Sequence, residues 1–404
     1  MNVLVINCGS SSIKYAVYEM PQAKLLGGGI VDRIGQGPST LQCEHGGRRQ
    51  TQRIEANDHS QAVRLILDGI AGDQHKLVPA GGKIDVVGHR VVHGGSIKSE
   101  IVFIDDGILG AVAEFAPMAP LHNPPTLAAI RTAMDVMPDI PHVACFDTAF
   151  HHTIPDVAYI YGLPARFYGK YGVRRYGFHG ISHRFVYARA AHMLGCSPEG
   201  FTAVTCHLGN GCSVAAIRDG RSVDTSMGMT PLEGLLMGTR AGDIDPGISL
   251  YLLGKGLGAD ELTSIMNNES GLLGISQVSA DMRDVLRAAG QGHKRAELAI
   301  QVFCYRLRKY IGAYIAVLGD LHALVFTGGI GENAAEIRRR TCADMGYLGI
   351  EIDPETNERT VGWEGDIATG ESRARVLVIP TNEELAIADN ACRLLAGRSC
   401  AAAR

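Results

Sequence analysis

The chain opens with a short apolar run, a turn of small polar residues and then an alternating segment. The run Val3–Ile6 is long enough for a buried strand and too short for a helix. Residues 7–12 (Asn-Cys-Gly-Ser-Ser-Ser) follow it, and apolar side chains alternate over residues 13–18, which predicts a second strand. We therefore expect a hairpin whose turn presents N–H groups, hydroxyls and the nearby Lys14 to a phosphate. An ordinary serine-rich hairpin turn is the alternative interpretation.

The same pattern returns in the second half of the chain. Residues 201–206 predict a strand, which ends in His-Leu-Gly-Asn-Gly at 207–211 and continues into an alternating segment at 214–218. Gly9 and Gly209 hold equivalent places in the two patterns. This similarity predicts two related domains that face each other across a cleft. Coincidence is the alternative, because glycine hairpins are common.

A third strand, residues 323–326, ends in the glycine-rich segment 327–333. Each of the three junctions puts backbone N–H groups at a strand end, where α/β folds bind their ligands. Their spacings match neither the P-loop nor the Rossmann fingerprint. Three such junctions in a chain of net charge −4 predict a nucleotide polyphosphate held by local groups rather than by overall charge.

Composition limits the class of protein. A length of 404 residues suggests two or three domains, and 46% hydrophobic with 20% charged residues indicates a globular fold. The ten cysteines form no CxxC pair, which favours free thiols in a reducing compartment. We find no signal peptide and no apolar stretch of roughly 18–20 residues that could span a membrane. We therefore expect a cytoplasmic protein without a membrane partner.

Residues 154–184 are rich in aromatic and basic side chains, a composition that can bind single-stranded nucleic acid. The acidic balance of the chain argues against this, and we expect no nucleic acid partner. His179 and His183 are four residues apart and could mimic a zinc pair. Gly180 between them and the lack of a nearby third ligand disfavour zinc.

We expect an N-terminal domain at residues 1–152 and a C-terminal domain at residues 153–382, with the helix at 383–404 returning to the first domain. Thr381 and Glu384 have the spacing of a capping box, which assigns Glu384 to the helix start and leaves Glu383 for other work.

Other local expectations concern three segments. Residues 84–87 predict a strand. Residues 36–60 are polar and predict weak strand character at best, and residues 126–137 predict a helix with Thr126 as its N-cap.

Nine segments, in order and spread over nearly the whole chain, form one set. They are NCGSSSIK at 7–14, HRVVHGG at 89–95, FDTAFHHTIP at 146–155, RRYGFHGISH at 174–183, HLGNG at 207–211, DTSMGMTPLEG at 224–234, GTRAGDIDP at 238–246, TGGIGEN at 327–333 and PTNEE at 380–384. This set resembles the acetate kinase family. Met229 and His152 depart from the usual family residues, but neither is a charged catalytic position.

The resemblance implies an α/β fold of two similar ATPase domains, like those of actin and the sugar kinases, facing across an active-site cleft. It implies a homodimer, with nucleotide binding and dimerisation assigned to the C-terminal domain. The implied reaction is the reversible transfer of phosphate from ATP to acetate with Mg²⁺, for which Mn²⁺ could substitute. A propionate kinase is the near alternative. A non-catalytic nucleotide switch, like actin or a chaperone ATPase, is the alternative from another class.

Phosphoryl transfer to a carboxylate brings two anions together, so the protein must hold them in line and neutralise their charge. The resemblance implies that Arg90 binds the acetate carboxylate, Arg240 binds the transferring phosphoryl group and His179 donates a hydrogen bond to the same oxygens. It assigns Asp147 to orienting these groups or to acid–base chemistry. A carboxylate nucleophile carries no proton at neutral pH, so the forward reaction needs no base.

The resemblance also implies the other binding residues. Asn7 and Glu383 are the oxygen ligands near Mg²⁺, directly or through water, and Lys14 lies near the phosphates. The remaining ATP-binding residues are His207, Leu208, Gly209, Asn210, Gly211, Asp281, Met282, Arg283, Gly329, Ile330, Gly331, Glu332 and Asn333. The residues around the acetate methyl group are Val92, Leu121, Phe178 and Pro231.

Structural roles are the alternatives for the charged candidates. Arg90 or Arg240 could form structural ion pairs, Asp147 could cap a turn, and Glu383 could favour a helix N-terminus through its dipole. Val92 is bulkier than alanine and should favour acetate, with propionate a slower substrate because one methylene shifts preference by only about 1–3 kcal/mol.

Overall fold

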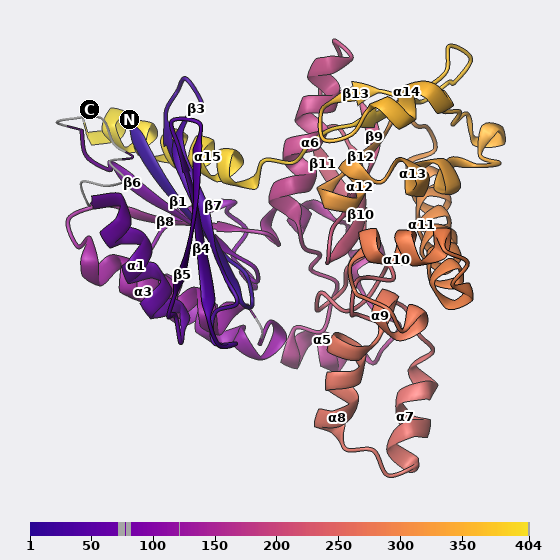
Figure 1. Cartoon of the computed structure of the whole chain (residues 1–404), viewed down its shortest axis with the longest axis horizontal. Helices are drawn as coiled ribbons and strands as arrows, with labels where there is room; N and C mark the ends of the chain where they lie inside the picture. Colours follow the sequence, from indigo (N-terminus) through magenta and orange to yellow (C-terminus); the bar gives the residue numbers. More distant parts are fainter. Residues whose placement is uncertain (72–76, 78–81, 121, 403–404) are drawn as a thin grey trace. The chain divides into compact units, whose positions relative to one another are not determined.

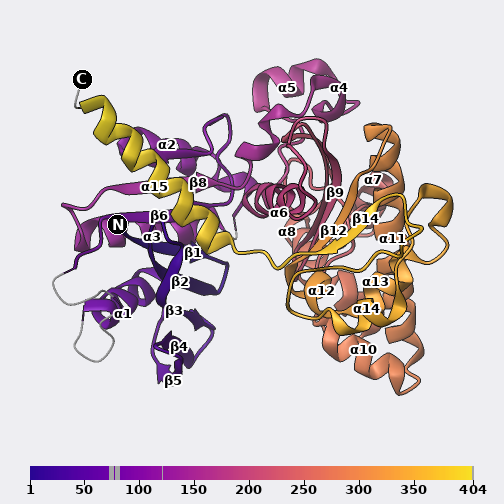
Figure 2. The ribbon, with the colours of Figure 1, turned by 90° about the horizontal axis from the view of Figure 1, so that it is seen from above.

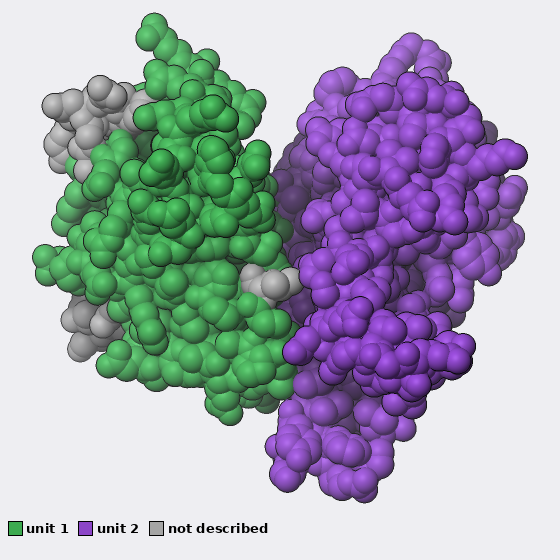
Figure 3. Space-filling view, turned by 60° about the horizontal axis from the view of Figure 1, so that its bottom comes forward, with its two compact units in different colours: residues 1–150, 382–404 green, residues 151–381 purple. Residues whose placement is uncertain are grey.

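A computed structural model describes residues 1–71, 77, 82–120 and 122–402, which form two compact units. Unit 1 comprises Met1–Phe150 and Asn382–Arg404, and unit 2 comprises His151–Thr381 (Figure 3). The chain thus leaves unit 1 once, builds unit 2 and returns to complete unit 1 with its last helix.

Unit 1 is built on one mixed sheet of eight strands in the order β5-β4-β3-β2-β1-β6-β8-β7. Strands β1, β6 and β8 run parallel, and the other neighbours pair antiparallel. The strands are β1 (Asn2–Cys8), β2 (Ser12–Glu19), β3 (Lys24–Asp32), β4 (Ser39–His45), β5 (Arg48–Ile54), β6 (Val86–Val91), β7 (Ile101–Phe103) and β8 (His142–Phe146). The helices are α1 (His59–Ala71), α2 (Asp106–Glu114), α3 (Asn123–Val136) and α15 (Glu383–Ala402), with single turns at Ala116–Met118 and Ala149–Thr153.

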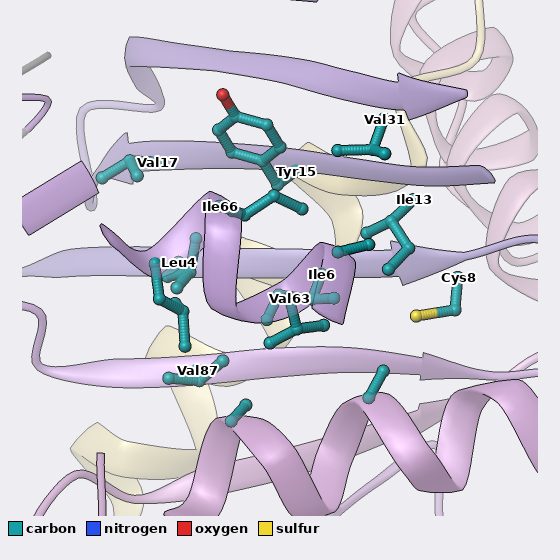
Figure 4. Close-up of a cluster of buried hydrophobic side chains, with 14 of the residues drawn as sticks. Leu4, Ile6, Cys8, Ile13, Tyr15, Val17, Val31, Val63, Ile66 and Val87 are labelled. Atoms are coloured by element: carbon teal, nitrogen blue, oxygen red, sulfur yellow. The ribbon is translucent and has the colours of Figure 1, made fainter. Parts of the chain in front are cut away.

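The two faces of this sheet pack against different helices (Figures 1 and 2). Leu4 and Ile6 of β1 and Val87 of β6 join Val63 and Ile66 of α1 in one buried cluster (Figure 4). Side chains alternate between the two faces of a strand, so the residues of β1 and β6 that neighbour Leu4, Ile6 and Val87 point to the opposite face, where α15 lies. This alternation decides which polar residues of unit 1 meet α15.

Gly88 of β6 allows α15 to approach the sheet. A Cβ atom at this position would lie 2.6 Å from Cγ2 of Ile387 on α15. We therefore expect Gly88→Ala to lower the free energy of unfolding by about 1–3 kcal/mol in urea titrations. Adding Ile387→Leu, which removes the methyl branch at Cβ, should restore part of that loss. Gly69→Ala on α1, where a Cβ meets nothing within 4 Å, is the control and should not destabilise the fold.

The expectation of weak strand character at residues 36–60 is wrong. These residues form the antiparallel pair β4–β5, which extends the sheet from β3. Most of their side chains are exposed or half-buried, so the sequence has no apolar alternation there. Gly46 and Gly47, both with positive φ, join the strands as a two-residue hairpin turn. This glycine pair was the feature of the sequence that could have predicted the hairpin.

Three element boundaries also differ from expectation. Helix α3 begins at Asn123 with Pro124 and Pro125 in its first turn, so Thr126 lies inside the helix and is not its N-cap. Strand β6 begins at Val86 and continues through Arg90 to Val91 rather than ending at residue 87.

The capping-box prediction for α15 is also wrong. The Asn382 side chain accepts a hydrogen bond from Leu385 N at 2.9 Å and caps the helix, because its oxygen is one residue closer to the first turn than that of Thr381.

Unit 2 contains a six-stranded sheet in the order β11-β10-β9-β12-β14-β13. Its strands are β9 (Thr202–Leu208), β10 (Cys212–Arg218), β11 (Arg221–Thr225), β12 (Ala323–Thr327), β13 (Gly365–Asp366) and β14 (Arg375–Val378). Its helices are α4 (Asp156–Tyr159), α5 (Ala165–Tyr171), α6 (Gly180–Met193), α7 (Pro246–Gly254), α8 (Ala259–Ser264), α9 (Gly271–Ser276), α10 (Met282–Gly290), α11 (Lys294–Leu318), α12 (Gly328–Asn333), α13 (Ala335–Cys342) and α14 (Pro354–Arg359), with single turns at Ile265–Glu269 and Gly346–Leu348.

The two sheets repeat one topology. In unit 1, β2 pairs antiparallel with β1, which runs parallel to β6 and then β8, and β7 closes the edge antiparallel. In unit 2, β10, β9, β12, β14 and β13 follow the same order and directions. Helices α6 and α11 flank the second sheet in both Figure 1 and Figure 2. The predicted duplication of the strand–glycine–strand pattern therefore reflects two units of the same architecture.

Candidate functional site

Three parallel strands of unit 1 end in polar residues on the face covered by α15. Asn7 lies on β1, Arg90 on β6, and Asp147 directly follows β8. Their chain neighbours Ile6, Val91 and Phe146 point to the opposite, apolar face of the sheet. Because neighbouring side chains of a strand point to opposite faces, the three polar side chains point toward α15. Glu383 and Glu384 open that helix. The five residues therefore form one cluster at the carboxyl ends of the parallel strands.

Arg90 is the central cation of this cluster. Its Nη2 lies 2.5 Å from Oδ2 of Asp147 and its Nε lies 3.2 Å from Oδ1, which is a bidentate pair, and Asp147 is fully buried. Nε of Arg90 also lies 3.7 Å from a carboxylate oxygen of Glu383. Burial alone would lower the pKa of Arg90, but Asp147, Glu383 and Glu384 raise it above its ordinary value. The guanidinium is thus held in place and firmly charged.

The side chain of Asn7 links Arg90 to the start of α15. Its oxygen accepts from Nη1 of Arg90 at 3.3 Å, and its amide donates to Glu383 at 3.2 Å and to Glu384 at 3.0 Å. The sequence analysis assigned Glu384 to a helix cap and therefore did not predict its contact with Asn7. The position of Glu384 directly beside Glu383 was the feature of the sequence that could have indicated this contact.

Two other unit 1 candidates occupy different surroundings. Lys14 pairs with Asn7 across the β1–β2 hairpin, which puts it on the same face, and its side chain is exposed. Val92 follows β6 and is 3% exposed. Leu121 lies outside the described residues.

In unit 2, His179 and Arg240 meet over the turn that follows β9. A Cβ atom on Gly211 would lie 3.4 Å from both Cε1 and Nε2 of His179 and 3.6 Å from Nη1 of Arg240. His179 adopts a left-handed backbone conformation, φ 57°, just before α6, a strained geometry for a residue other than glycine. Its ring stacks on that of His207, with centroids 4.3 Å apart.

Arg240 differs electrostatically from Arg90. Its Nη1 lies 3.4 Å from the carbonyl oxygen of Pro231 and 3.9 Å from the sulfur of Met237. Burial lowers the pKa of Arg240, although the Cys212 thiol opposes this shift. The guanidinium remains charged, because the pKa of arginine lies far above neutrality. An anion beside it would offset part of the cost of its burial.

A pocket of 820 Å³ lies at the ends of β9 and β12 in unit 2. Eight predicted ATP-binding residues line it, together with Ser279, Ala280, Leu286 and Ala334. Its walls come from the β9–β10 turn, from the start of α10 and from α12. The eight predicted residues are Gly209, Asn210, Asp281, Met282, Arg283, Gly329, Ile330 and Asn333.

Other predicted ATP-binding residues make contacts in the interior of unit 2 and do not line the pocket. The segment 327–333, expected to be a loop, forms the short helix α12. The carboxylate of Glu332 accepts from the backbone N–H of Gly328 at 2.8 Å and of Thr381 at 3.0 Å. Leu208 and Gly331 are buried in the sheet and the helix. These residues shape the ends of β12 and β14 around the pocket.

The basic aromatic stretch makes internal contacts. The guanidinium of Arg174 lies 3.6 Å from the ring centroid of Tyr159. Arg175 pairs with Glu233 at 2.6 Å and donates to the carbonyl oxygen of Thr225 at 2.8 Å. Arg175 therefore holds the segment that leads to Pro231 and Arg240. Among the described residues, no group of three or more His, Cys, Asp or Glu side chains could hold a metal.

Acid should destabilise unit 2 through His151. Its Nδ1 lies 2.8 Å from Oγ of Ser222, its Nε2 lies 3.0 Å from the carbonyl oxygen of Phe178, and burial lowers its pKa to about 4. The unfolded chain, with an ordinary histidine pKa near 6.5, therefore binds more protons between about pH 6.5 and 4. The titration of His151 should contribute about 2 kcal/mol to the fall in the free energy of unfolding from pH 7 to pH 5, as measured by urea titration.

Two variants separate this contribution from the other titrating groups. His151→Gln should show a shallower loss of stability over the same range. His45→Gln, at an exposed position, should keep the slope of the parent protein. Equal slopes in all three proteins would contradict the assignment to His151.

The repeated topology, with polar clusters and glycine turns at the ends of parallel strands, is that of the two-domain actin-like ATPase fold. The profile of the Acetokinase family matches residues 2–389. The acetate kinase of Thermotoga maritima is 49% identical over 391 residues, covering 96% of this chain and 97% of the relative.

Solved structures agree with this comparison. Porphyromonas gingivalis acetate kinase superposes with a TM-score of 0.91 at 43% identity, covering 98% of this chain and 99% of the other. A propionate kinase from Francisella tularensis superposes with a TM-score of 0.91 at 39% identity, covering 97% and 99%. The chain belongs to the acetokinase family, which confirms the predictions of family, fold class and a phosphotransferase with a carboxyl group as acceptor. In the described part of the chain, every helix is too short or too polar to cross a bilayer.

Proposed function

We propose that the chain is an acetate kinase that transfers the γ-phosphoryl group of ATP to acetate, with Mg²⁺, and runs the reverse reaction at the same site. A carboxylate oxygen of acetate attacks the γ-phosphorus, the bond from that phosphorus to the bridging oxygen breaks, and ADP leaves with the electron pair. The products are acetyl phosphate and ADP. Acetate enters as an anion, so no proton has to be removed.

The observation that carries this proposal is the 820 Å³ pocket, whose lining includes eight of the residues that the family resemblance assigned to ATP. Beside it, Gly209 and Gly211 form the turn on which His179 and Arg240 converge. The oxygens of a phosphoryl group above this turn would accept hydrogen bonds from the guanidinium of Arg240 and from the imidazole N–H of His179. Such preorganised donors stabilise the charge that develops during transfer.

We assign the acetate carboxylate to Arg90, with Asp147 holding that guanidinium in position. The bidentate pair supports a positioning role for Asp147 over proton transfer, since its oxygens already accept two N–H groups of Arg90. Val92, Phe178 and Pro231 stay as predictions for the surroundings of the methyl group. The prediction that one active site takes Arg90 from unit 1 and Arg240 from unit 2 rests on the family.

The Asn7 cluster is chemically suited to Mg²⁺. Asp147 is engaged by Arg90, which leaves Glu383 and Glu384 beside Asn7 as two carboxylates whose negative charge a divalent cation would offset. Asn7 and Glu383 remain our candidate ligands, and Glu384 joins them because it shares the amide of Asn7. Bound Mg²⁺ would neutralise phosphate oxygens during transfer.

Two further properties belong to the proposal. We place the protein in the cytoplasm, supported by nine free cysteines in the described part of the chain. We also expect a homodimer, and the apolar exposure of α7 supports it: Leu250 and Tyr251 are 72% and 63% exposed.

Trapping the product with hydroxylamine tests the function. Purified protein with ATP and Mg²⁺ should form an acyl hydroxamate in proportion to acetate, and none without a carboxylic acid. Slow ATP hydrolysis that is indifferent to acetate would support a nucleotide switch and contradict the proposal. The 39% identical propionate kinase makes propionate the necessary comparison, and a higher kcat/KM for propionate than for acetate would reassign the substrate.

A further inference from the structure

Behind His179, a chain of hydrogen bonds runs into the interior of unit 2. Nδ1 of His179 lies 2.9 Å from Oγ of Ser213, and Nε2 of His183 lies 2.7 Å from the same oxygen. Nδ1 of His183 lies 2.7 Å from Oγ1 of Thr205. Ser213, His183 and Thr205 are all 0% exposed. Water therefore does not compete for these contacts.

Local structure explains why these four side chains meet. Thr205 on β9 shares a face with His207 two residues later, and Ser213 on β10 is the cross-strand partner of His207. That face lies against α6. His183 is four residues beyond His179, so the two rings lie on the same side of the helix start. The strands supply the hydroxyl groups and the helix supplies the imidazoles.

Ser213 is fully buried and, among the described residues, its hydroxyl meets only these two ring nitrogens, so it donates to one ring and accepts from the other. The protons in this chain can therefore be ordered in two ways. In the first order, Thr205 donates to Nδ1 of His183, Nε2–H of His183 donates to Ser213, and Ser213 donates to Nδ1 of His179. The proton of a neutral His179 is then on Nε2. In the reverse order, Nδ1–H of His179 donates to Ser213, and every later bond is also reversed.

The buried end of the chain selects the first order. In the reverse order Thr205 would accept from His183, and its own hydroxyl proton would need another acceptor. Among the described residues, no second hydrogen-bond partner of this fully buried hydroxyl is present. An unmade hydrogen bond at a buried group is costly, so the order in which Thr205 donates is favoured.

We propose that Thr205, His183 and Ser213 are positioning residues that keep the proton of His179 on Nε2, where it can be donated to the transferring phosphoryl group. Nε2 is the ring nitrogen that faces Gly211 and Arg240. The inference deepens the proposed function and depends on it for the identity of the acceptor. Burial, with His151 and His207 acting in the same direction, lowers the pKa of His183 well below its usual value, which keeps that link neutral.

The tautomer of His179 can be measured without any turnover. In protein labelled with ¹⁵N in its histidine rings, long-range proton–nitrogen correlations distinguish a protonated ring nitrogen from a bare one. The His179 signals are identified by their loss in His179→Gln. We expect Nε2–H and bare Nδ1 in the parent protein. Thr205→Val, nearly the same shape without the hydroxyl, should shift His179 toward a mixture of tautomers, whereas Thr205→Ser should retain the parent spectrum.

Kinetics give the second readout. Thr205→Val and Ser213→Ala should each lower kcat for acetyl phosphate formation by about 10- to 100-fold, the range typical of residues that orient a functional histidine, with KM for ATP little changed. Thr205→Ser should recover most of the activity. Ser372→Ala also removes a buried serine hydroxyl, but one that precedes β14 and bonds to backbone groups of Gly349, Glu351 and Ala374, so it should leave kcat and the His179 signals unchanged.

Parent-like His179 signals and kcat in both Thr205→Val and Ser213→Ala would overturn the inference. A protonated Nδ1 in the parent protein would overturn it as well. Absence of acetate-dependent turnover in the parent would instead refute the proposed function, while the spectra would still report whether the chain of hydrogen bonds sets the tautomer.

Discussion

Replacing Arg240 by alanine is expected to lower kcat for acetyl phosphate formation by about 10²–10³-fold without loss of stability. The side chain contributes a preorganised positive charge beside Gly211, where the phosphoryl group is proposed to lie. Burial lowers its pKa, so the folded protein bears a desolvation cost for this charge, and removing it should leave the free energy of unfolding within about 1 kcal/mol of the parent. Steady-state kinetics and urea titration measure the two effects.

Two variants make this result specific. Arg240→Lys keeps the charge but loses the planar pair of donors, so it should recover only part of the rate. Arg359→Ala removes an exposed arginine of unit 2 that pairs with Glu355, and it should change neither kcat nor stability. A kcat for Arg240→Ala within threefold of the parent would remove Arg240 from the site.

Replacing Arg90 by alanine should damage both activity and stability. We expect a loss of about 10²–10³-fold in kcat, because the acetate carboxylate would lose its guanidinium. The free energy of unfolding should also fall by about 3–5 kcal/mol, because the carboxylate of fully buried Asp147 would lose the bidentate guanidinium that balances its charge. The predicted effects on stability differ because carboxylates surround Arg90 and raise its pKa, whereas burial lowers the pKa of Arg240.

A double variant separates the two roles of Arg90. Arg90→Met with Asp147→Asn removes both charges of the pair and should recover a large part of the lost stability. It should not recover activity, since no guanidinium remains for acetate. Unchanged stability in Arg90→Ala, or activity in the double variant, would contradict this account of the cluster.

The parts of the fold that follow from local patterns could be predicted from the sequence. Both glycine hairpins and the strand at residues 323–326 show apolar runs that end in small or polar residues. These elements bury one face or both, and burial is what the spacing of apolar residues records.

The rest depends on contacts between residues far apart in the sequence. The β4–β5 hairpin exposes most of its side chains and is held by backbone pairing to β3, which leaves no apolar pattern. Glu384 reaches Asn7 only because α15 lies on the unit 1 sheet.

The sequence analysis likewise did not select Ser213 and Thr205, for which we propose a positioning role, because nothing in their local sequence indicates that two imidazoles reach their hydroxyls. Motifs in the sequence therefore nominate candidate site residues, but not the residues that contact them from elsewhere in the chain.

Unit 1 is completed by a helix that follows the whole of unit 2 in the chain. When unit 2 has emerged from the ribosome, unit 1 therefore still lacks α15 and with it Glu383 and Glu384. Until α15 emerges, the face of the unit 1 sheet that this helix covers stays exposed and Asn7 lacks its carboxylate partners. A translation product that stops before α15 should consequently be inert and dependent on chaperones.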